Sequence, residues 1–320
     1  ACAANNRQLT RCTPWSRRMF LKRVAPPEGT RASDLFVGNV VTIYSRKMKV
    51  VEYADERTAR HFAATRSTCV AIVTPRAVRR LGVIMQGVQD AGMEIAQLRQ
   101  LRLSRAEAEA FQKLGGGRGG ADLTSGAVVA LELVAADCWR TATEHGRGYP
   151  GLRLSPSEAC VEKEIEFCFG GDRKTTALHR DCTVCIVRPY AVADGSAAAI
   201  IADIQAAGFS IAAASTVQFT NGDASDLYDA YKGVVAEYRH WTRDLAAGPA
   251  IAMELVGEDV AAQFRKFVGP YNPEIARLLR PDTLRAKHGK STVQNAVHCT
   301  DLPTDGPLES KFIFHVMQQA

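Results

Sequence analysis

The sequence predicts an α+β protein in which one domain occurs twice, behind a smaller β-rich segment. Three observations support this prediction. Three segments recur in the same order, about 115 to 122 residues apart. Within each copy, apolar β-branched runs alternate with stretches of helical spacing. The residues before about 66 match neither copy. A period this long indicates a duplicated domain rather than a solenoid unit.

The internal repeat rests on three pairs of similar segments. They are "AIVTPRAV" (71–78) with "CIVRPYAV" (185–192), "DAGMEIAQL" (90–98) with "AAGFSIAAA" (206–214), and "SGAVVALELV" (125–134) with "AGPAIAMELV" (247–256). We assign residues 67–172 to the first copy and residues 180–320 to the second copy.

Each copy has the same predicted order of elements. An apolar run ends at a proline, which stops the strand. In "LGVIMQGVQDAG", Leu81, Ile84 and Val88 fall on one helical face before Gly92 ends the helix. Two apolar strands, another helix and a last strand follow. The order β-α-β-β-α-β predicts a ferredoxin-like domain, whose antiparallel sheet carries helices on one face.

Residues 1–66 form the third predicted region, which is small and β-rich. The stretch "DLFVGNVVTIYSRKMKVVEY" alternates apolar and polar residues around a Gly-Asn pair. Alternation on both sides of Gly-Asn is typical of a β-hairpin, with these two residues in the turn.

The composition narrows the classes of protein to which this chain can belong. With 46% apolar and 23% charged residues, the chain of 320 residues is long enough for two or three folded domains. No run of 18 apolar residues occurs, which argues against a membrane span. The net charge of +6 favours an acidic partner. The basic residues form no stripe interleaved with aromatics, which argues against a nucleic-acid module.

Nine cysteines, an odd number scattered through a long chain, fit reduced thiols better than a disulfide framework. Cys182 and Cys185 form a C-x-x-C motif inside the apolar run "DCTVCIVRP". No second cysteine pair exists to complete a zinc site. We therefore interpret both as strand residues and expect no metal site.

The second copy resembles a nucleoside diphosphate kinase domain over nearly its full length. The resemblance rests on "NAVHCTD", "RPDTLRAKHG" just before it, the strand "IVRPYAV" and the strand "GPAIAMELV". Several dispersed matches in the right order make the resemblance specific, whereas a single N-x-x-H motif would not.

Two such domains in tandem behind a short β-rich segment resemble the nucleoside diphosphate kinase homolog 7 group. In that group the leading segment is a DM-ten domain, and the first 66 residues look like its last part. The resemblance implies a protein of the ciliary or flagellar axoneme, a microtubule inner protein of doublet microtubules that binds tubulin and other axonemal proteins. It also allows a place at the basal body or centrosome.

The resemblance assigns roles to five residues of the second copy. It implies that His298 takes the γ-phosphoryl group of a nucleoside triphosphate and passes it to a diphosphate, and that Glu309 orients the imidazole. Arg265 and Arg285 match arginines that hold the phosphates, and Asn295 matches the asparagine that touches the sugar and phosphates. A planar guanidinium suits phosphate oxygens. Mg²⁺ would accompany the nucleotide.

Several positions depart from the family pattern. The family's phosphate-binding lysine is Arg188, which keeps the charge but is longer and planar. A threonine on the phosphate loop is Tyr271, which is much bulkier. The Gly and Ser after the histidine are Cys299 and Thr300. The family's active-site tyrosine aligns with Tyr228 only after a one-residue insertion.

The first copy is further from catalysis. Its position for the lysine is Thr74, which carries no charge. From Glu132 to Glu164 is 32 residues, whereas Glu254 to Glu309 in the second copy is 55. The missing stretch of about 23 residues is the loop that supplies the arginines, the asparagine and the histidine. Arg153 falls about where the histidine would be, so we predict an inactive first copy.

Two hypotheses for the whole chain follow. In the structural hypothesis the domains bind tubulin, and His298 is inherited in a pocket that binds nucleotide weakly or not at all. In the enzymatic hypothesis the second copy is a nucleoside diphosphate kinase that transfers phosphate through His298. Catalytic members of the family assemble as hexamers of single domains, and a tandem pair allows an internal pseudo-dimer instead.

Overall fold

The computed structural model describes strands within residues 2–49, residue 55, and residues 67–115, 122–135, 138–146, 149–170 and 173–317. By their contacts the residues fall into two compact units. One comprises Ala1–Ser67 with Ala135–Cys138, and the other comprises Thr68–Val134 with Trp139–Ala320. Within these described ranges, no helix is both long and apolar enough to cross a bilayer.

The amino-terminal unit contains short antiparallel strands. β1 (Cys2–Asn5), β2 (Gln8–Cys12) and β3 (Met19–Val24) form one sheet, and β4 (Val40–Ile43) pairs with β5 (Arg46–Lys49). Ile43 lies opposite Arg46, so the Gly-Asn pair at 38–39 precedes both strands of this hairpin. The predicted Gly-Asn turn itself lies outside the described residues and stays a prediction. The DM-ten-like assignment of residues 1–66 falls mostly outside the described residues.

The second copy has the predicted βαββαβ order. Its elements are β10 (Cys182–Val187), α6 (Pro189–Ala193), α7 (Ala197–Ala206), β11 (Ser210–Val217), α8 (Asn221–Leu227), η3 (Asp229–Tyr231), α9 (Tyr238–Leu245), β12 (Ala250–Val256), α10 (Val260–Val268), α11 (Pro273–Leu279), α12 (Leu284–His288), β13 (Val297–Cys299), α13 (Gly306–Lys311) and the π-helical turn η4 (Phe312–Val316). The strands lie in the order β13-β10-β12-β11, all antiparallel. This is the ferredoxin-like arrangement.

The first copy repeats this arrangement with fewer elements. They are β6 (Ser67–Val73), η2 (Val78–Arg80), α2 (Leu81–Asp90), β7 (Glu94–Arg102), α3 (Arg105–Leu114), β8 (Ala127–Ala135), α4 (Cys138–Gly146), β9 (Leu152–Leu154) and α5 (Glu158–Phe169). The strand order is β9-β6-β8-β7, which matches that of the second copy position by position. The predicted fold class, α+β with two tandem ferredoxin-like domains, is confirmed.

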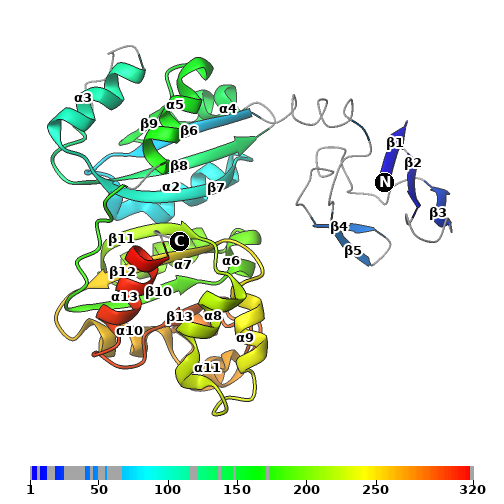
Figure 1. Ribbon diagram of the computed structural model, residues 1–320, viewed down its shortest axis with the longest axis vertical. Coiled ribbons are helices and arrows are strands. Elements are labelled where there is room, and N and C mark those ends of the chain that lie inside the picture. Colours follow the sequence, from blue (N-terminus) through cyan, green and yellow to red (C-terminus); the bar gives the residue numbers. More distant parts are fainter. Residues whose placement is uncertain are drawn as a thin grey trace. The chain divides into compact units, whose positions relative to one another are not determined.

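The two copies share one eight-stranded sheet, in which β7 of the first copy pairs with β11 of the second. In Figure 1 the first copy runs from cyan to green and the second from green to red. Helices α2 and α7 also pack together, so closely that a Cβ on Gly82 would collide with the backbone of Ala202. The duplicated domains therefore form an internal pair.

Local sequence signals explain several of these elements. The helix α2 buries Leu81, Ile84 and Val88, as their spacing predicts. The helix α3 begins at Ser104, whose side chain accepts a hydrogen bond from the Glu107 amide in a capping box. Cys182 and Cys185 are buried in β10 without a disulfide, as predicted for strand residues.

Candidate active site

His298 lies on the short strand β13, opposite Ile186 of β10. The residue is only 4% exposed. Its Nε2 lies 3.1 Å from Oε2 of Glu309, which sits in the first turn of α13. The same carboxylate oxygen accepts a hydrogen bond of 2.8 Å from the Thr300 hydroxyl. The structure thus brings together the histidine and the carboxylate that the sequence paired, and a third residue holds the carboxylate.

Tyr228 forms the other side of the histidine environment. Its ring lies edge-on to the imidazole, with 5.5 Å between centroids. Tyr228 is buried, and its hydroxyl has no hydrogen-bond partner among the described residues. Burial raises the pKa of this phenol, so the hydroxyl keeps its proton and remains a donor. Although Tyr228 matches the family's active-site tyrosine only after a one-residue insertion, its ring lies beside His298.

A cleft of about 1080 Å³ opens above this histidine. Its wall is mixed, with more cationic than anionic side chains. The cationic lining residues are Arg188, Arg265, Lys266, Arg280 and Arg285; the anionic ones are Glu237 and Asp301; the aromatic ones are Tyr228, Tyr231, Trp241 and Tyr271. A concave, basic and partly aromatic surface suits an anionic ligand that also carries a ring.

Arg285, on α12, is a partly buried cation of this cleft. Its guanidinium donates hydrogen bonds to the carbonyls of Gly269 and Val297, at 3.0 and 3.1 Å. Its Nε has no partner in the described part of the chain. Burial lowers the pKa of Arg285, since no carboxylate there pairs with it to offset the desolvation. Carbonyl partners leave its positive charge uncancelled.

Arg265, on α10, stands at the cleft mouth. Its side chain is 52% exposed and forms an ion pair with Asp301. Asp301 also accepts a hydrogen bond of 2.6 Å from the Tyr231 hydroxyl. An exposed ion pair of this kind is weak, because both charges remain solvated. Arg265 is therefore free to exchange Asp301 for another anion.

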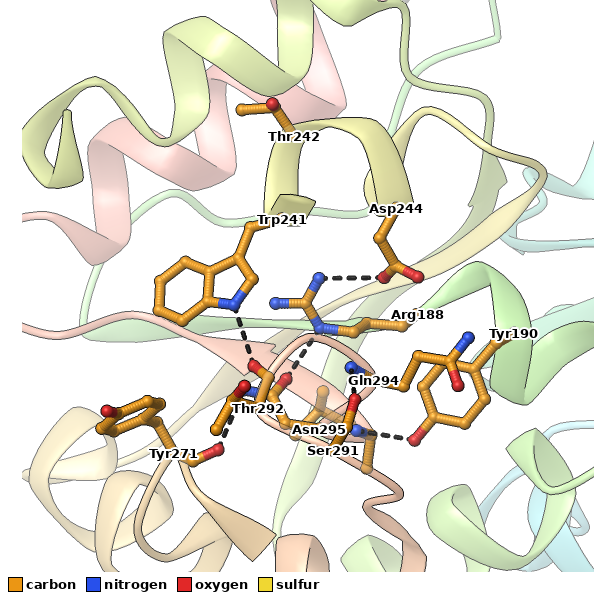
Figure 2. A network of polar contacts seen from close by, with 12 residues as sticks. Arg188, Tyr190, Trp241, Thr242, Asp244, Tyr271, Ser291, Thr292, Gln294 and Asn295 are labelled. Carbon is orange, nitrogen blue, oxygen red and sulfur yellow. Dashed lines mark hydrogen bonds and ion pairs between the residues drawn. The ribbon is translucent and has the colours of Figure 1, made fainter. Parts of the chain in front are cut away.

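Arg188 and Asn295 are more tightly held (Figure 2). Arg188 is 2% exposed; its Nε donates to Oδ1 of Asn295 at 2.8 Å, and its Nη1 lies 3.2 Å from Oδ2 of Asp244. The Asn295 amide in turn donates to the Tyr271 carbonyl at 3.3 Å. The two residues line the predicted site, where they bind each other, Asp244 and the Tyr271 carbonyl.

Sequence reasoning missed two residues of this network. Asp244 lies in the last turn of α9 next to Arg188. The hydroxyl of Tyr190 accepts a hydrogen bond from the amide of Ala296 at 2.8 Å and donates one to the His288 carbonyl at 3.0 Å. The one signal in the sequence that could have indicated a partner such as Asp244 was Arg188, an arginine where the family has a lysine. A longer, permanently charged arginine in a buried place requires a partner, and the sequence contains many acids that could serve.

The departures from the family pattern have separate outcomes. Tyr271 is half exposed, with its ring 6.2 Å from that of Trp241, so it does not fill the space beside the histidine. Cys299 is buried at the cleft, and burial raises the pKa of its thiol. Thr300 keeps a hydroxyl where the family has serine, and uses it to hold Glu309.

The first copy contains the same frame without the histidine. Arg153 lies opposite Ile72 of β6, the register position that His298 occupies in the second copy. Its guanidinium lies 3.6 Å from Glu164, which accepts a hydrogen bond of 2.6 Å from Ser155. The five residues between α4 and β9 replace the α11–α12 segment of the second copy.

Comparison with known proteins agrees with this geometry. The family model for nucleoside diphosphate kinase matches residues 181–318. The chain is similar to nucleoside diphosphate kinase homolog 7 of Rattus norvegicus, with 35% identity covering 94% of this chain and 84% of the relative. The corresponding mouse protein is 34% identical with the same coverage.

A shorter relative covers one copy. The nucleoside diphosphate kinase of Aquifex aeolicus is 31% identical over 41% of this chain and 92% of its own length. A crystal structure of that enzyme aligns with a TM-score of 0.40 and 30% identity, over 43% of this chain and 97% of the crystallised one. The similarity to the rat and mouse proteins, over 84% of the length of each, shows that the chain belongs to the nucleoside diphosphate kinase family, in the nucleoside diphosphate kinase homolog 7 group.

Proposed function

We propose that the second copy is a nucleoside diphosphate kinase domain that transfers phosphate through His298. The observation that carries the proposal is the imidazole held by Glu309 at the base of a basic cleft. Because Nε2 engages the carboxylate, Nδ1 is the nitrogen available for attack. Its lone pair forms a bond to the γ-phosphorus, the bond to the bridging oxygen breaks, and the nucleoside diphosphate leaves with that electron pair. A second diphosphate then reverses the step.

Two unpartnered donors support a phosphate position beside the imidazole. The Tyr228 hydroxyl and the Arg285 Nε are both buried and without hydrogen-bond partners among the described residues. Leaving a buried donor unsatisfied costs about 1–3 kcal/mol. Phosphate oxygens would satisfy both donors, so binding a triphosphate would recover part of this cost. Mg²⁺ would enter as part of the nucleotide substrate and neutralise its charge.

The test is covalent labelling. Incubation of the chain with γ-labelled ATP and Mg²⁺ should give an acid-labile, base-stable phosphohistidine, which a chase with unlabelled diphosphate removes. His298→Ala should abolish the label, and Glu309→Gln should slow its formation. His240→Ala, at an exposed histidine of α9, is the matched control and should label normally. Folded protein that takes no label at millimolar nucleotide would contradict the proposal.

A second role is favoured by the first copy, which keeps its fold and has lost its site. The Arg153–Glu164 pair stands where the histidine dyad would be, and the loop is absent. We propose that the chain also serves as a microtubule inner protein of ciliary or flagellar doublet microtubules, binding tubulin and other axonemal proteins. A domain retained for its surface needs its core and can dispense with its phosphate loop. An active second copy would then generate GTP beside tubulin.

Extraction and imaging test this role. The protein should stay with the axoneme after salt and detergent extraction, and a tagged chain should label the axoneme along its length. Release with the soluble matrix would contradict the proposal. Label confined to the basal body or centrosome would favour a place in microtubule-nucleating structures instead.

A further inference from the structure

Arg188 supports the segment that leads to the candidate nucleophile. Its backbone amide donates to the Ala296 carbonyl at 3.0 Å, and its side-chain Nε donates to Asn295 at 2.8 Å. Two consecutive residues before Val297 are thus held by one residue at the end of β10. Ala296 has a φ of +73°, a left-handed conformation that is unfavourable for a residue with a Cβ. Fixed partners on both sides keep that turn in place.

The remaining face of the Arg188 guanidinium contacts Asp244. The carboxylate is 12% exposed and lies on the last turn of α9, one turn after Trp241. The guanidinium carbon lies 5.9 Å from the Tyr228 ring centroid and 6.0 Å from that of Trp241. Burial raises the pKa of Asp244, and the neighbouring Arg188 opposes the rise. Figure 2 shows the arginine between Asp244 and Asn295, with the indole of Trp241 beside it.

Arg188 and Arg285, both on the cleft wall, differ in their partners. Arg285 binds two carbonyls and keeps its charge, whereas Arg188 faces a carboxylate that cancels it. A neutral oxygen would satisfy the Nη1 hydrogen bond equally well, so the carboxylate does more than complete the bonding. Its charge lowers the positive potential on the wall that Arg188 shares with His298 and Tyr228.

We propose that Asp244 is a positioning residue that holds Arg188 away from bound phosphates and weakens nucleotide binding in this cleft. The inference rests on the proposed phosphotransfer function. In the resting protein Arg188 serves as a clamp on Asn295 and Ala296, whereas the partners of Arg265 and Arg285 leave those two guanidinium groups available to phosphate. Neutralising Asp244 returns one uncancelled positive charge to the cleft wall.

The variant Asp244→Asn tests this, because it removes the charge and keeps the shape. By isothermal calorimetry it should bind Mg·ADP about 5- to 10-fold more tightly than wild type, as expected for one charge-assisted contact. In single-turnover labelling with ATP, the half-saturating concentration should fall by a similar factor while the labelled fraction at saturation stays the same. A purely structural role would lower the melting temperature and would not raise affinity.

Two further variants make the result specific. The double variant Arg188→Met, Asp244→Asn should lose the gain, because the gain requires the uncancelled charge of the Arg188 guanidinium. Asp203→Asn removes the carboxylate of an ion pair with Lys287 and His288 outside the cleft lining, and should bind Mg·ADP like wild type. If Asp244→Asn does not fold, Asp244→Ser removes the same charge and carries the same expectation.

Each remaining outcome is decisive. Unchanged or weaker binding by a folded Asp244→Asn protein overturns the role of Asp244 and leaves the proposed function standing, provided that wild type binds. A gain that survives in the double variant overturns the role of Arg188 in it. Folded wild type and variant that both fail to bind Mg·ADP at millimolar concentration overturn the proposed function and this inference together.

Discussion

The two copies share a frame made of a carboxylate, a hydroxyl and a strand amide. They differ in the residue that faces the carboxylate, which is a histidine in one copy and an arginine in the other. In the second copy Glu309 binds His298 and Thr300, and Thr300 accepts the amide of Val184 on the neighbouring strand. In the first copy Glu164 faces Arg153 and binds Ser155, which accepts the amide of Val70 in the same way.

This comparison separates the frame from the chemistry. The carboxylate, the hydroxyl two residues after the variable position and the strand amide recur in both copies, so they serve the fold whether or not a histidine is present. What differs is the residue beside the carboxylate and the segment of α11 and α12 that supplies Arg285 and the Asn295 turn. The parts that the proposed phosphotransfer would use can therefore be absent without loss of the domain's strand order.

The largest expected difference between the copies involves the equivalent glutamates of strands β12 and β8, Glu254 and Glu132. Glu254 is 0% exposed and accepts hydrogen bonds from the amides of Leu178 and His179 and from the Ser310 hydroxyl. Its counterpart Glu132 is partly exposed and accepts one bond, from Gln97. Glu254→Ala should lower the free energy of unfolding by about 3–5 kcal/mol, because it leaves several buried donors unpaired.

Glu132→Ala is the matched control and should cost about 1 kcal/mol or less, since water can replace the carboxylate. Urea denaturation followed by circular dichroism measures both variants. Equal losses at the two positions would show that the copies do not differ here as their hydrogen bonds indicate.

The second prediction concerns Arg153 and depends on pH. Burial raises the pKa of Glu164, while Ser155 and Arg153 oppose the rise. The folded state therefore holds this proton to higher pH than the unfolded chain, so stability is present at low pH and falls as pH rises through the raised pKa. Arg153→Met removes one opposing group and should raise that pKa further.

The expected cost of Arg153→Met is about 1–3 kcal/mol at pH 8 and clearly less at pH 5, where Glu164 is closer to its neutral form. Denaturation curves at the two pH values measure the difference. The same curves for His298→Asn give the change in stability at the matching position of the second copy. If Arg153→Met loses the same stability at both pH values, the result would argue against a charged Glu164.

The third and smallest expected effect on stability concerns Gly151 and Ala296, which stand two positions before Arg153 and His298. Gly151 and Ala296 both have positive φ, +92° and +73°, and each carbonyl accepts the amide of the residue that ends the neighbouring strand, Thr74 or Arg188. Ala296→Gly should stabilise the chain by about 0.5–1 kcal/mol, because glycine adopts this conformation without strain.

The reciprocal change, Gly151→Ala, should destabilise by about 1–2 kcal/mol. Besides the strain, its Cβ would lie 2.5 Å from the Cβ of Ala77. Differential scanning calorimetry of the two variants gives opposite shifts in melting temperature if the two turns are equivalent. Shifts of the same sign would show that they are not.

The sequence predicted the fold well because the repeat aligned two copies of one pattern, and each copy corrected the other. That alignment also placed Arg153 in the register of His298. It did not reveal Asp244 or Tyr190, whose partners lie 56 and 106 residues away along the chain and depend on side-chain packing. The predicted Gly-Asn turn at residues 38–39 lies outside the described residues, so it stays a prediction.

The pairing of β7 with β11 has a consequence for any attempt to study one half of the chain alone. Gln100 donates to the Ala212 carbonyl at 2.7 Å and the Leu98 amide donates to Thr216 at 2.9 Å, so each copy covers an edge of the other. Cutting between the copies would expose two long unpaired edges, while the outer strands β9 and β13 have only three residues each. The first copy thus covers a strand edge of the second copy that could otherwise pair with another chain.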